Sequence, residues 1–238
     1  MPTSEKTTKK ATGTSKPSGT KKTSAKKQTS AKPASKTAKA AGKVKKAAKP
    51  AVEQTARLIG TQVVWEGPLF RVVRDTVVEP GGVTSERDII RHNGSVVILA
   101  VDSSTSKKNP WIVMERQYRH AAQQFLWELP AGKLEIGEEP VEGARRELAE
   151  ETGYAAKKWK PLVEYFPSPG FLGESMQIFL AEGLVAGEAH PEEDEKIELR
   201  LVRLSDILKW IEKGLIHDGK TLSGILFYAR KLDQKRKK

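Results

Sequence analysis

The sequence predicts an α/β fold in a single domain, residues 51–238, that follows an N-terminal tail, residues 1–50. Three observations support this prediction. The composition changes sharply near residue 50, short apolar stretches alternate with turn residues after it, and helices with distinct start and stop residues lie among them. Strands that come before, between and after helices are typical of an α/β sandwich.

The tail differs from the rest of the chain in both charge and hydrophobicity. It contains 15 Lys and a single acid, Glu5, and so carries +14, whereas the whole chain of 238 residues carries +12 and the remainder therefore −2. Without aromatic residues, the tail cannot bury enough apolar surface to offset the entropy of ordering its backbone, and we expect it to be disordered. It resembles Lys/Ala-rich linker-histone-like tails, which implies non-specific binding to nucleic acid phosphates. A merely solubilising extension is the alternative.

Cysteine and long apolar runs are both missing from the sequence. The first absence excludes a disulfide framework and any thiolate nucleophile or metal ligand. The second excludes a membrane-spanning helix, which needs about 18 consecutive apolar residues, and the chain starts without the apolar segment of a signal peptide. We expect a cytoplasmic protein, with association with a nucleoid or chromatin as the alternative.

Five strands are expected in the first half of the domain, at Gln62–Glu66, Leu69–Glu79, Ser85–His92, Ser95–Asp102 and Trp111–Glu115. The second of them alternates apolar and polar residues and ends at a Pro-Gly-Gly turn, which favours an antiparallel arrangement of the early strands. The fourth is almost entirely apolar, as in strands that are buried on both faces.

The clearest helix is expected at Pro140–Thr152, where proline stands at the start, apolar residues form one stripe, and Gly153 follows as the stop. Two more strands are predicted at Gln177–Glu182 and Ile197–Leu204. Two more helices are predicted, one with Ser205 as its N-cap and running through Trp210, and a final one at Thr221–Leu232.

Three carboxylates lie on one flank of the Pro140–Thr152 helix. Glu147, Glu150 and Glu151 stand at positions i, i+3 and i+4, which places the first and last about 6 Å apart. Clustered carboxylates repel one another, so Arg146 and a bound cation are needed to keep them ionised, and Mg²⁺ prefers such oxygen ligands and bridges to phosphates. A solvated acidic helix face is the alternative reading of this spacing.

The complete segment Gly132–Tyr154, GKLEIGEEPVEGARRELAEETGY, resembles the signature of the Nudix hydrolase family at each of its seven fixed positions. Only Tyr154 departs from the pattern, which favours an aliphatic residue there. The resemblance implies an α/β/α sandwich with a mixed sheet and hydrolysis of a phosphoanhydride that joins a nucleoside to a second group.

The resemblance also implies roles for the residues of this segment. Gly132 allows a tight loop, and Arg146 orients the carboxylates. Glu147 and Glu151 are implied as the principal ligands of Mg²⁺, or of Mn²⁺ in its place, with Glu150 as a third ligand that also belongs to the catalytic group with Arg146.

Flanking segments resemble the ADP-ribose pyrophosphatase subfamily: Glu115–Arg119, Trp127–Gly132 and Ser168–Phe171. This similarity implies that the Ala131 carbonyl joins the metal shell and that Arg119 contacts substrate phosphate or ribose. It further implies Glu193 as the base that takes a proton from water and Glu195 as a metal ligand, whereas a plain solvated loop is the alternative for both.

The subfamily resemblance implies a homodimer in which Phe70 of one subunit and Arg87 of the other enclose the adenine. A core position is the alternative for Phe70. The expected reaction is hydrolysis of a nucleotide sugar, ADP-ribose to AMP and ribose 5-phosphate. Alternatives are ADP-glucose or GDP-mannose hydrolysis, and a nucleic-acid-associated regulator that senses a nucleotide. His92 and His120 are expected in structural or surface roles.

Overall fold

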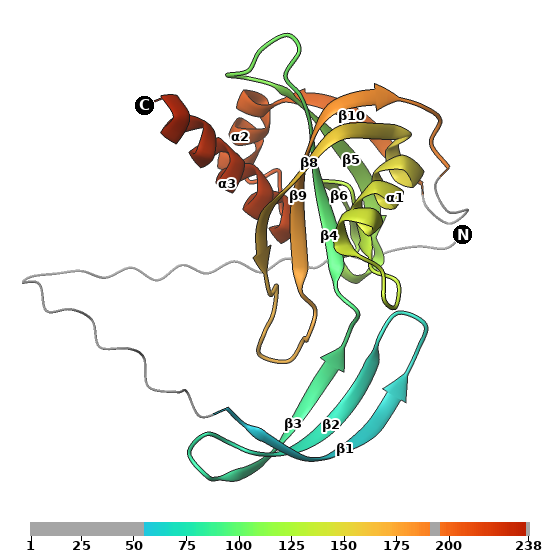
Figure 1. The fold of residues 1–238 in the computed structure, drawn as a ribbon, viewed down its shortest axis with the longest axis vertical. Coiled ribbons are helices and arrows are strands. Elements are labelled where there is room, and N and C mark those ends of the chain that lie inside the picture. Colours follow the sequence, from blue (N-terminus) through green and yellow to red (C-terminus); the bar gives the residue numbers. More distant parts are fainter. Residues whose placement is uncertain (1–54, 191–195, 237–238) are drawn as a thin grey trace, which may run out of the picture. The chain divides into compact units, whose positions relative to one another are not determined.

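One compact unit of the chain comprises Val52–Lys238, and a computed structural model describes residues 55–190 and 196–236 of it (Figure 1). The prediction of a disordered tail concerns residues 1–50, which lie outside the described residues. No helix within the described ranges is both long and apolar enough to cross a membrane.

Three strands form an antiparallel sheet at the start of the unit: β1 (Arg57–Glu66), β2 (Arg71–Val78) and β3 (Thr84–Arg91). The predicted antiparallel arrangement is confirmed. All ten residues of β1 are exposed, whereas Val73 and Asp75 of β2 are buried. The Asp75 carboxylate accepts hydrogen bonds from the Thr61 hydroxyl at 2.8 Å and from Arg91 Nη2 at 2.5 Å, so its burial leaves no unsatisfied charge.

Seven strands form the central mixed sheet, in the order β10-β5-β4-β9-β8, with β6 paired to β5 and β7 paired to β4. Only the β4–β9 pair is parallel. The bounds are β4 (Ser95–Asp102), β5 (Trp111–Arg119), β6 (Gln124–Glu128), β7 (Ala131–Lys133), β8 (Tyr154–Tyr165), β9 (Met176–Ala186) and β10 (Glu198–Arg203), with a short 3₁₀ helix, η1 (His120–Ala122), between β5 and β6.

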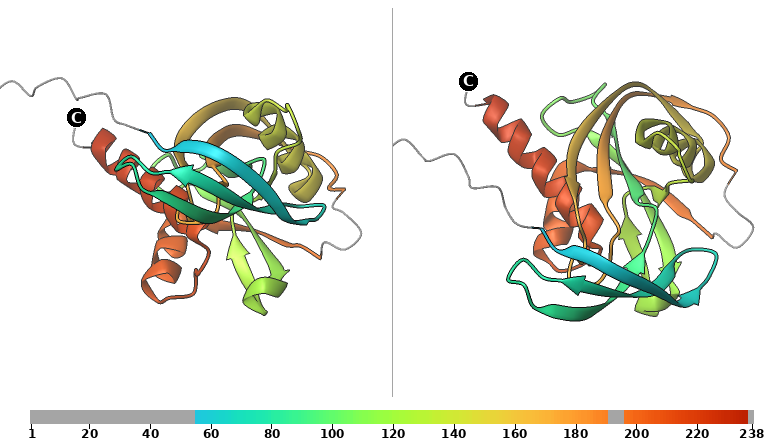
Figure 2. Two further views of the ribbon diagram at one scale, coloured as in Figure 1. Left: turned by 90° about the horizontal axis from the view of Figure 1, so that it is seen from below. Right: turned by 60° about the horizontal axis from the view of Figure 1, so that its bottom comes forward.

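Three α-helices cover this sheet on its two faces: α1 (Pro140–Thr152) on one, and α2 (Leu204–Glu212) and α3 (Gly219–Arg236) on the other (Figures 1 and 2). The period-2 alternation of β4 explains the two layers. Val97, Leu99 and Val101 pack in the cluster that includes residues of α2 and α3, whereas Val96, Ile98 and Ala100 pack in the cluster that includes residues of α1. The predicted α/β/α sandwich with a mixed sheet, and the burial of β4 on both faces, are confirmed.

The ends of α1 are as predicted. Pro140 occupies the first turn, and Gly153 takes the left-handed conformation at φ 69° while its N–H donates to the Ala149 carbonyl. The predicted N-cap of α2 is wrong: α2 begins at Leu204, and Ser205 lies inside it. The side-chain oxygen of Asn109, from the β4–β5 loop, accepts the hydrogen bond of the Ser205 N–H at 2.9 Å, so the cap comes from a distant segment.

Candidate active site

A pocket of about 650 Å³ lies beside α1, between the start of β4, the strand β7 and the residues that precede β9. Six residues with a predicted catalytic, metal-binding or substrate-binding role line it: Arg119, Ala131, Arg146, Glu147, Glu150 and Glu151. The structure therefore brings together six predicted site residues from three separate elements. We call this space the active pocket.

One arginine holds most of the carboxylates together. Arg146 Nη1 donates to Glu147 at 2.8 Å and to Glu150 at 3.0 Å, while its Nε and Nη2 donate to Glu138 at 3.0 and 3.1 Å. Its Nη2 also reaches the Lys133 carbonyl at 3.1 Å. These bonds raise the pKa of Arg146 and hold the pKa of Glu138 below its ordinary value. We call Arg146, Glu138, Glu147 and Glu150 the Arg146 cluster.

Glu147 and Glu151 are buried against the backbone of β7. Gly132 lies so close to the Glu147 carboxylate that any Cβ at position 132 would overlap it. The Glu151 Oε2 atom accepts the N–H of Ala131 at 3.0 Å. Only 9% of Glu147 and 4% of Glu151 are exposed. Helix and strand therefore fix both carboxylates, and glycine is the one residue that leaves room for this packing.

The charge of the active pocket suits a cation. Five carboxylates and four Lys or Arg side chains line it, and two of these basic groups, Arg119 and Lys220, are bonded to a carboxylate outside the lining, Glu128. Among residues 55–190 and 196–236 no three acidic or imidazole groups stand at metal-binding geometry, and Arg146 lies between Glu147 and Glu150. The carboxylate donors nevertheless fit a hard divalent cation, which takes oxygen ligands.

A second charged group contributes Arg119 and Lys220 to the lining of the active pocket. Glu128, 1% exposed, accepts two hydrogen bonds from Arg119 at 3.0 and 2.9 Å and one from Lys220, whose ammonium also lies 3.3 Å from Asp218. Burial would raise the pKa of Glu128, but Arg119 and Lys220 outweigh it and hold that pKa below its ordinary value. We call Arg119, Glu128 and Lys220 the Glu128 cluster; the sequence indicated only Arg119 of its members.

Phe70 and Arg87 do not line the active pocket of this chain. Phe70 packs its ring 5.1 Å from that of Trp65, and Arg87 bonds Glu79 at 2.6 Å on the exposed surface of the first sheet. Glu193 and Glu195 lie outside the described residues.

Three residues that line the active pocket had no predicted role in it: His92, Ser95 and Glu174. We expected His92 in a structural or surface role. The Ser95 hydroxyl donates to Glu174 at 2.5 Å, and the Nδ1 atom of His92 accepts the N–H of Gly94 at 3.0 Å. Glu174 and Ser95 are 79 residues apart and meet only because β4 and β9 run parallel, so no spacing in the sequence signals the group.

Comparisons with known proteins identify the family of the chain. The family profile of the NUDIX domain matches residues 91–222. The chain is 38% identical over 177 residues to the ADP-ribose pyrophosphatase of Bacillus subtilis (strain 168), which covers 74% of this chain and 93% of that protein. It is 36% identical over 173 residues to the methanol dehydrogenase activator of Bacillus methanolicus, covering 72% and 91%.

The crystal structure of an ADP compounds hydrolase has the same fold, with a TM-score of 0.66 and 20% identity over 78% of this chain and 98% of that one. The family profile extends over more than half of this chain, and both sequence relatives match along nearly their whole length. The chain therefore belongs to the Nudix family, as a hydrolase that is similar to the ADP-ribose pyrophosphatases.

Proposed function

We propose that the chain hydrolyses the pyrophosphate of a nucleoside-diphosphate sugar, with ADP-ribose as the substrate and AMP and ribose 5-phosphate as products. The carrying observation is the active pocket, where Glu147 and Glu151 are buried and held in place beside Gly132 and Ala131. The similarity to an ADP-ribose pyrophosphatase along 93% of its length supports the choice of substrate.

The family uses a divalent metal, and we propose Mg²⁺, with Mn²⁺ as a substitute. Glu147, Glu150, Glu151, Glu195 and the Ala131 carbonyl would hold it. When bound, the ion neutralises phosphate oxygens and lowers the pKa of a bound water. Arg146 would keep the carboxylates ionised and aligned until the ion arrives, because its guanidinium already bonds two of them.

Glu193 is the proposed base that takes a proton from the attacking water. Its neighbour His190 supports this assignment, since His190 lines the active pocket and its N–H donates to the Glu150 carbonyl at 2.8 Å. The loop that carries Glu193 therefore starts at the rim of the pocket.

Arg119 is the proposed contact for substrate phosphate or ribose. Its Nε and Nη2 atoms bond Glu128, and within the described ranges its Nη1 atom makes no hydrogen bond. An arginine that is fixed by a buried carboxylate and whose Nη1 atom keeps both of its N–H donors can meet a phosphate without losing further side-chain entropy.

A homodimer through the first sheet would complete the site. Leu58, Ile59, Val63, Val64 and Trp65 of β1 are each about half exposed, and exposed apolar side chains in such number favour association. In such a dimer the partner's Arg87 could meet the adenine beside Phe70. Sedimentation of the full chain and of Val64→Glu tests it: we expect a dimer and a monomer, respectively, and a monomeric unsubstituted chain would contradict the proposal.

A substrate panel tests the main proposal. With purified protein and Mg²⁺, we expect ADP-ribose to have a higher kcat/KM than ADP-glucose, GDP-mannose or a nucleoside triphosphate. Faster hydrolysis of one of the other sugar nucleotides would transfer the assignment to that substrate. Binding of nucleotides without any turnover would instead favour a nucleotide-sensing regulator.

We propose that the basic tail binds nucleic acid without sequence specificity. This binding would hold a cytoplasmic enzyme near a nucleoid or chromatin. Its 15 Lys would neutralise phosphates without reading bases. Deleting residues 1–50 should remove DNA binding at low salt and leave turnover unchanged. DNA binding that survives the deletion would locate the contact elsewhere.

A further inference from the structure

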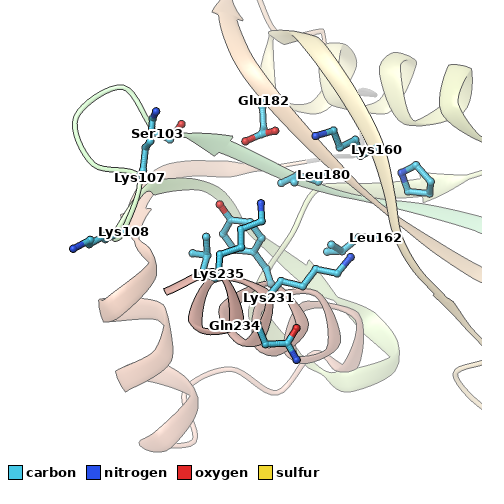
Figure 3. A pocket seen from close by; sticks show the side chains of 13 residues that line it. Ser103, Lys107, Lys108, Lys160, Leu162, Leu180, Glu182, Lys231, Gln234 and Lys235 are labelled. Carbon is cyan, nitrogen blue, oxygen red and sulfur yellow. The ribbon is translucent and has the colours of Figure 1, made fainter. Parts of the chain in front are cut away.

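A second cavity, of about 860 Å³, lies between α3, the strands β8 and β9, and the loop between β4 and β5 (Figure 3). It shares no lining residue with the active pocket, although α3 reaches both. Five lysines border it: Lys107, Lys108, Lys160, Lys231 and Lys235. We call it the lysine groove; its volume lies within the range of about 300–1,000 Å³ that is typical of small-molecule sites.

The floor of the lysine groove is apolar. Leu162 and Tyr228 are buried, at 9% and 6% exposure, and belong to the main core cluster, against which Leu180 and Leu232 pack. In Figure 3, Leu162 and Leu180 lie in the middle of the view, between α3 and the strands. An aliphatic chain that lies along this floor would be removed from water, which stabilises the complex by about 25 cal/mol per Å² of apolar surface buried.

The rim of the groove is strongly basic. Lys160 comes from β8 and Lys231 and Lys235 come from α3, so the ammonium groups face the floor from two sides (Figure 3). Glu182 is the one acid in the lining. Within residues 55–190 and 196–236, Lys107, Lys160, Lys231 and Lys235 make no salt bridge; the Lys231 ammonium lies 4.8 Å from the Phe227 ring centroid. Such a cluster of uncompensated charge favours an anion.

A tyrosine hydroxyl supplies a second polar feature of the groove. Tyr228 lines the groove, and its hydroxyl has no hydrogen-bond partner among the described residues. Burial, with the charge of Glu182, raises the pKa of Tyr228 to about 12, so the hydroxyl keeps its proton and is available as a donor. A ligand in the groove would accept this hydrogen bond in place of water.

We propose that the lysine groove binds an amphipathic anion: an acyl or alkyl chain that lies on Leu162, Leu180 and Leu232 and carries a phosphate headgroup held by Lys160, Lys231 and Lys235. The apolar floor accounts for the chain, and the lysines account for the phosphate, which point-like ammonium groups bind well. The Tyr228 hydroxyl donates to the ligand where the two parts meet.

Nucleic acid fits the groove less well. A single strand binds by following exposed lysines with its phosphates and by stacking its bases on exposed aromatic faces. Here the aromatic ring in the lining, that of Tyr228, is 94% buried, and the surface between the lysines is aliphatic. An acidic peptide would match the lysines, but its polar backbone would gain little from the aliphatic floor.

Binding of defined probes to the full chain tests the proposal. Decyl phosphate is titrated by calorimetry at physiological salt with EDTA, which removes divalent ions from the active pocket. Inorganic phosphate supplies the headgroup alone, and decyltrimethylammonium supplies the chain with the opposite charge. We expect decyl phosphate to bind at least about 100-fold more tightly than either, because both the chain and the charge are needed.

Substitutions locate the site. The double change Lys160→Gln with Lys235→Gln should weaken the binding of decyl phosphate at least about tenfold, and Tyr228→Phe about three- to tenfold, as for the loss of one ordinary hydrogen bond. The matched control, Lys157→Gln with Lys213→Gln, removes two exposed lysines outside the groove and should change nothing. Glu151→Gln should also leave this affinity unchanged, which separates the groove from the active pocket.

Several results would overturn the proposal. Equal affinity for decyltrimethylammonium would remove the charge selectivity, and equal affinity for inorganic phosphate would remove the apolar floor. An equal loss in the control variant would place the binding elsewhere. If the groove lysines were needed for a single-stranded oligonucleotide and not for decyl phosphate, the site would be a nucleic acid contact instead.

Discussion

The Arg146 cluster and the Glu128 cluster border the same pocket with opposite proportions of acid and base. In the first, three carboxylates surround one guanidinium, and Glu151 lies one helical turn from Glu147. In the second, a guanidinium and an ammonium share the buried carboxylate of Glu128. The first cluster has more carboxylates than basic groups and needs a further cation, whereas the carboxylate of the second cluster already has its counter-charges.

The difference assigns the two clusters different tasks. The Arg146 cluster should matter for catalysis more than for folding, because its excess charge is useful only once a metal and a phosphate bind. The Glu128 cluster should matter for folding first, because removing one partner leaves a charge buried without compensation. Substitutions at matched positions can test this division.

The largest effect is expected for Glu151→Gln, a change at the carboxylate that lies next to the Arg146 cluster on α1. This change keeps the size and the hydrogen bond from Ala131, yet it removes a carboxylate from the proposed metal site. We expect kcat to fall on the order of 10³-fold, with unfolding little changed. Glu142→Gln, an exposed carboxylate on the same helix, is the control. Near-normal turnover of Glu151→Gln would remove Glu151 from the catalytic assignment.

The next effect concerns stability and should appear in the Glu128 cluster. Glu128→Gln leaves Arg119 and Lys220 without their shared counter-charge, so the free energy of unfolding should fall by about 3–5 kcal/mol. Urea denaturation measures it, with the exposed Glu198→Gln as control. Adding Lys220→Met should restore part of the loss. If Glu128→Gln were as stable as the control, the cluster would have no structural role.

The two clusters also differ in how well the sequence predicts them. The carboxylates of α1 and Arg146 are separated by one to four residues on one helix, so helical geometry alone brings them together. Glu128 meets Lys220 across 92 residues and Arg119 through the β5–β6 pairing. A contact that depends on how α3 packs on the sheet leaves no local pattern to detect.

The strands, too, are predicted well only where they leave a local pattern in the sequence. β4 was predicted with its bounds because an apolar run buried on both faces is a strong signal. β8 was missed because it is an edge strand: most of its residues are partly or fully exposed, and Pro161 lies at a register shift where the pairing with β9 is irregular. β7 has three residues, Ala131–Lys133, too few for any periodicity, although it carries the backbone against which Glu147 and Glu151 pack.

A smaller effect should follow from Gly132→Ala, which links β7 to the Arg146 cluster. The new methyl group would occupy the place of the Glu147 carboxylate and push it away from its position. We expect turnover to fall by about 10- to 100-fold, as when a metal ligand loses its orientation. Gly81→Ala is the control, because nothing lies within 4 Å of a Cβ there. Equal activities of the two variants would show that the position of Glu147 is not critical.

The smallest expected effect is a change in the pH dependence of stability. The folded state holds the pKa of Glu128 below its ordinary value of 4.5, so the ionised carboxylate stabilises the fold above pH 4.5 and this contribution is lost as the pH falls through the lowered pKa. Glu128→Gln cannot titrate and should lose less stability on acidification than the unsubstituted chain.

Urea denaturation between pH 7 and pH 3 measures both slopes. Glu150→Gln is the comparison, because Glu150 is an exposed carboxylate of the Arg146 cluster. This change removes one hydrogen bond from Arg146 and also relieves repulsion between carboxylates. If the Glu128 cluster is the structural one, only Glu128→Gln makes the loss of stability at low pH less steep. If the unsubstituted chain and Glu128→Gln lost stability equally on acidification, the pKa of Glu128 would be the same in the folded and unfolded states. The division between the two clusters would then rest on their effects on catalysis alone.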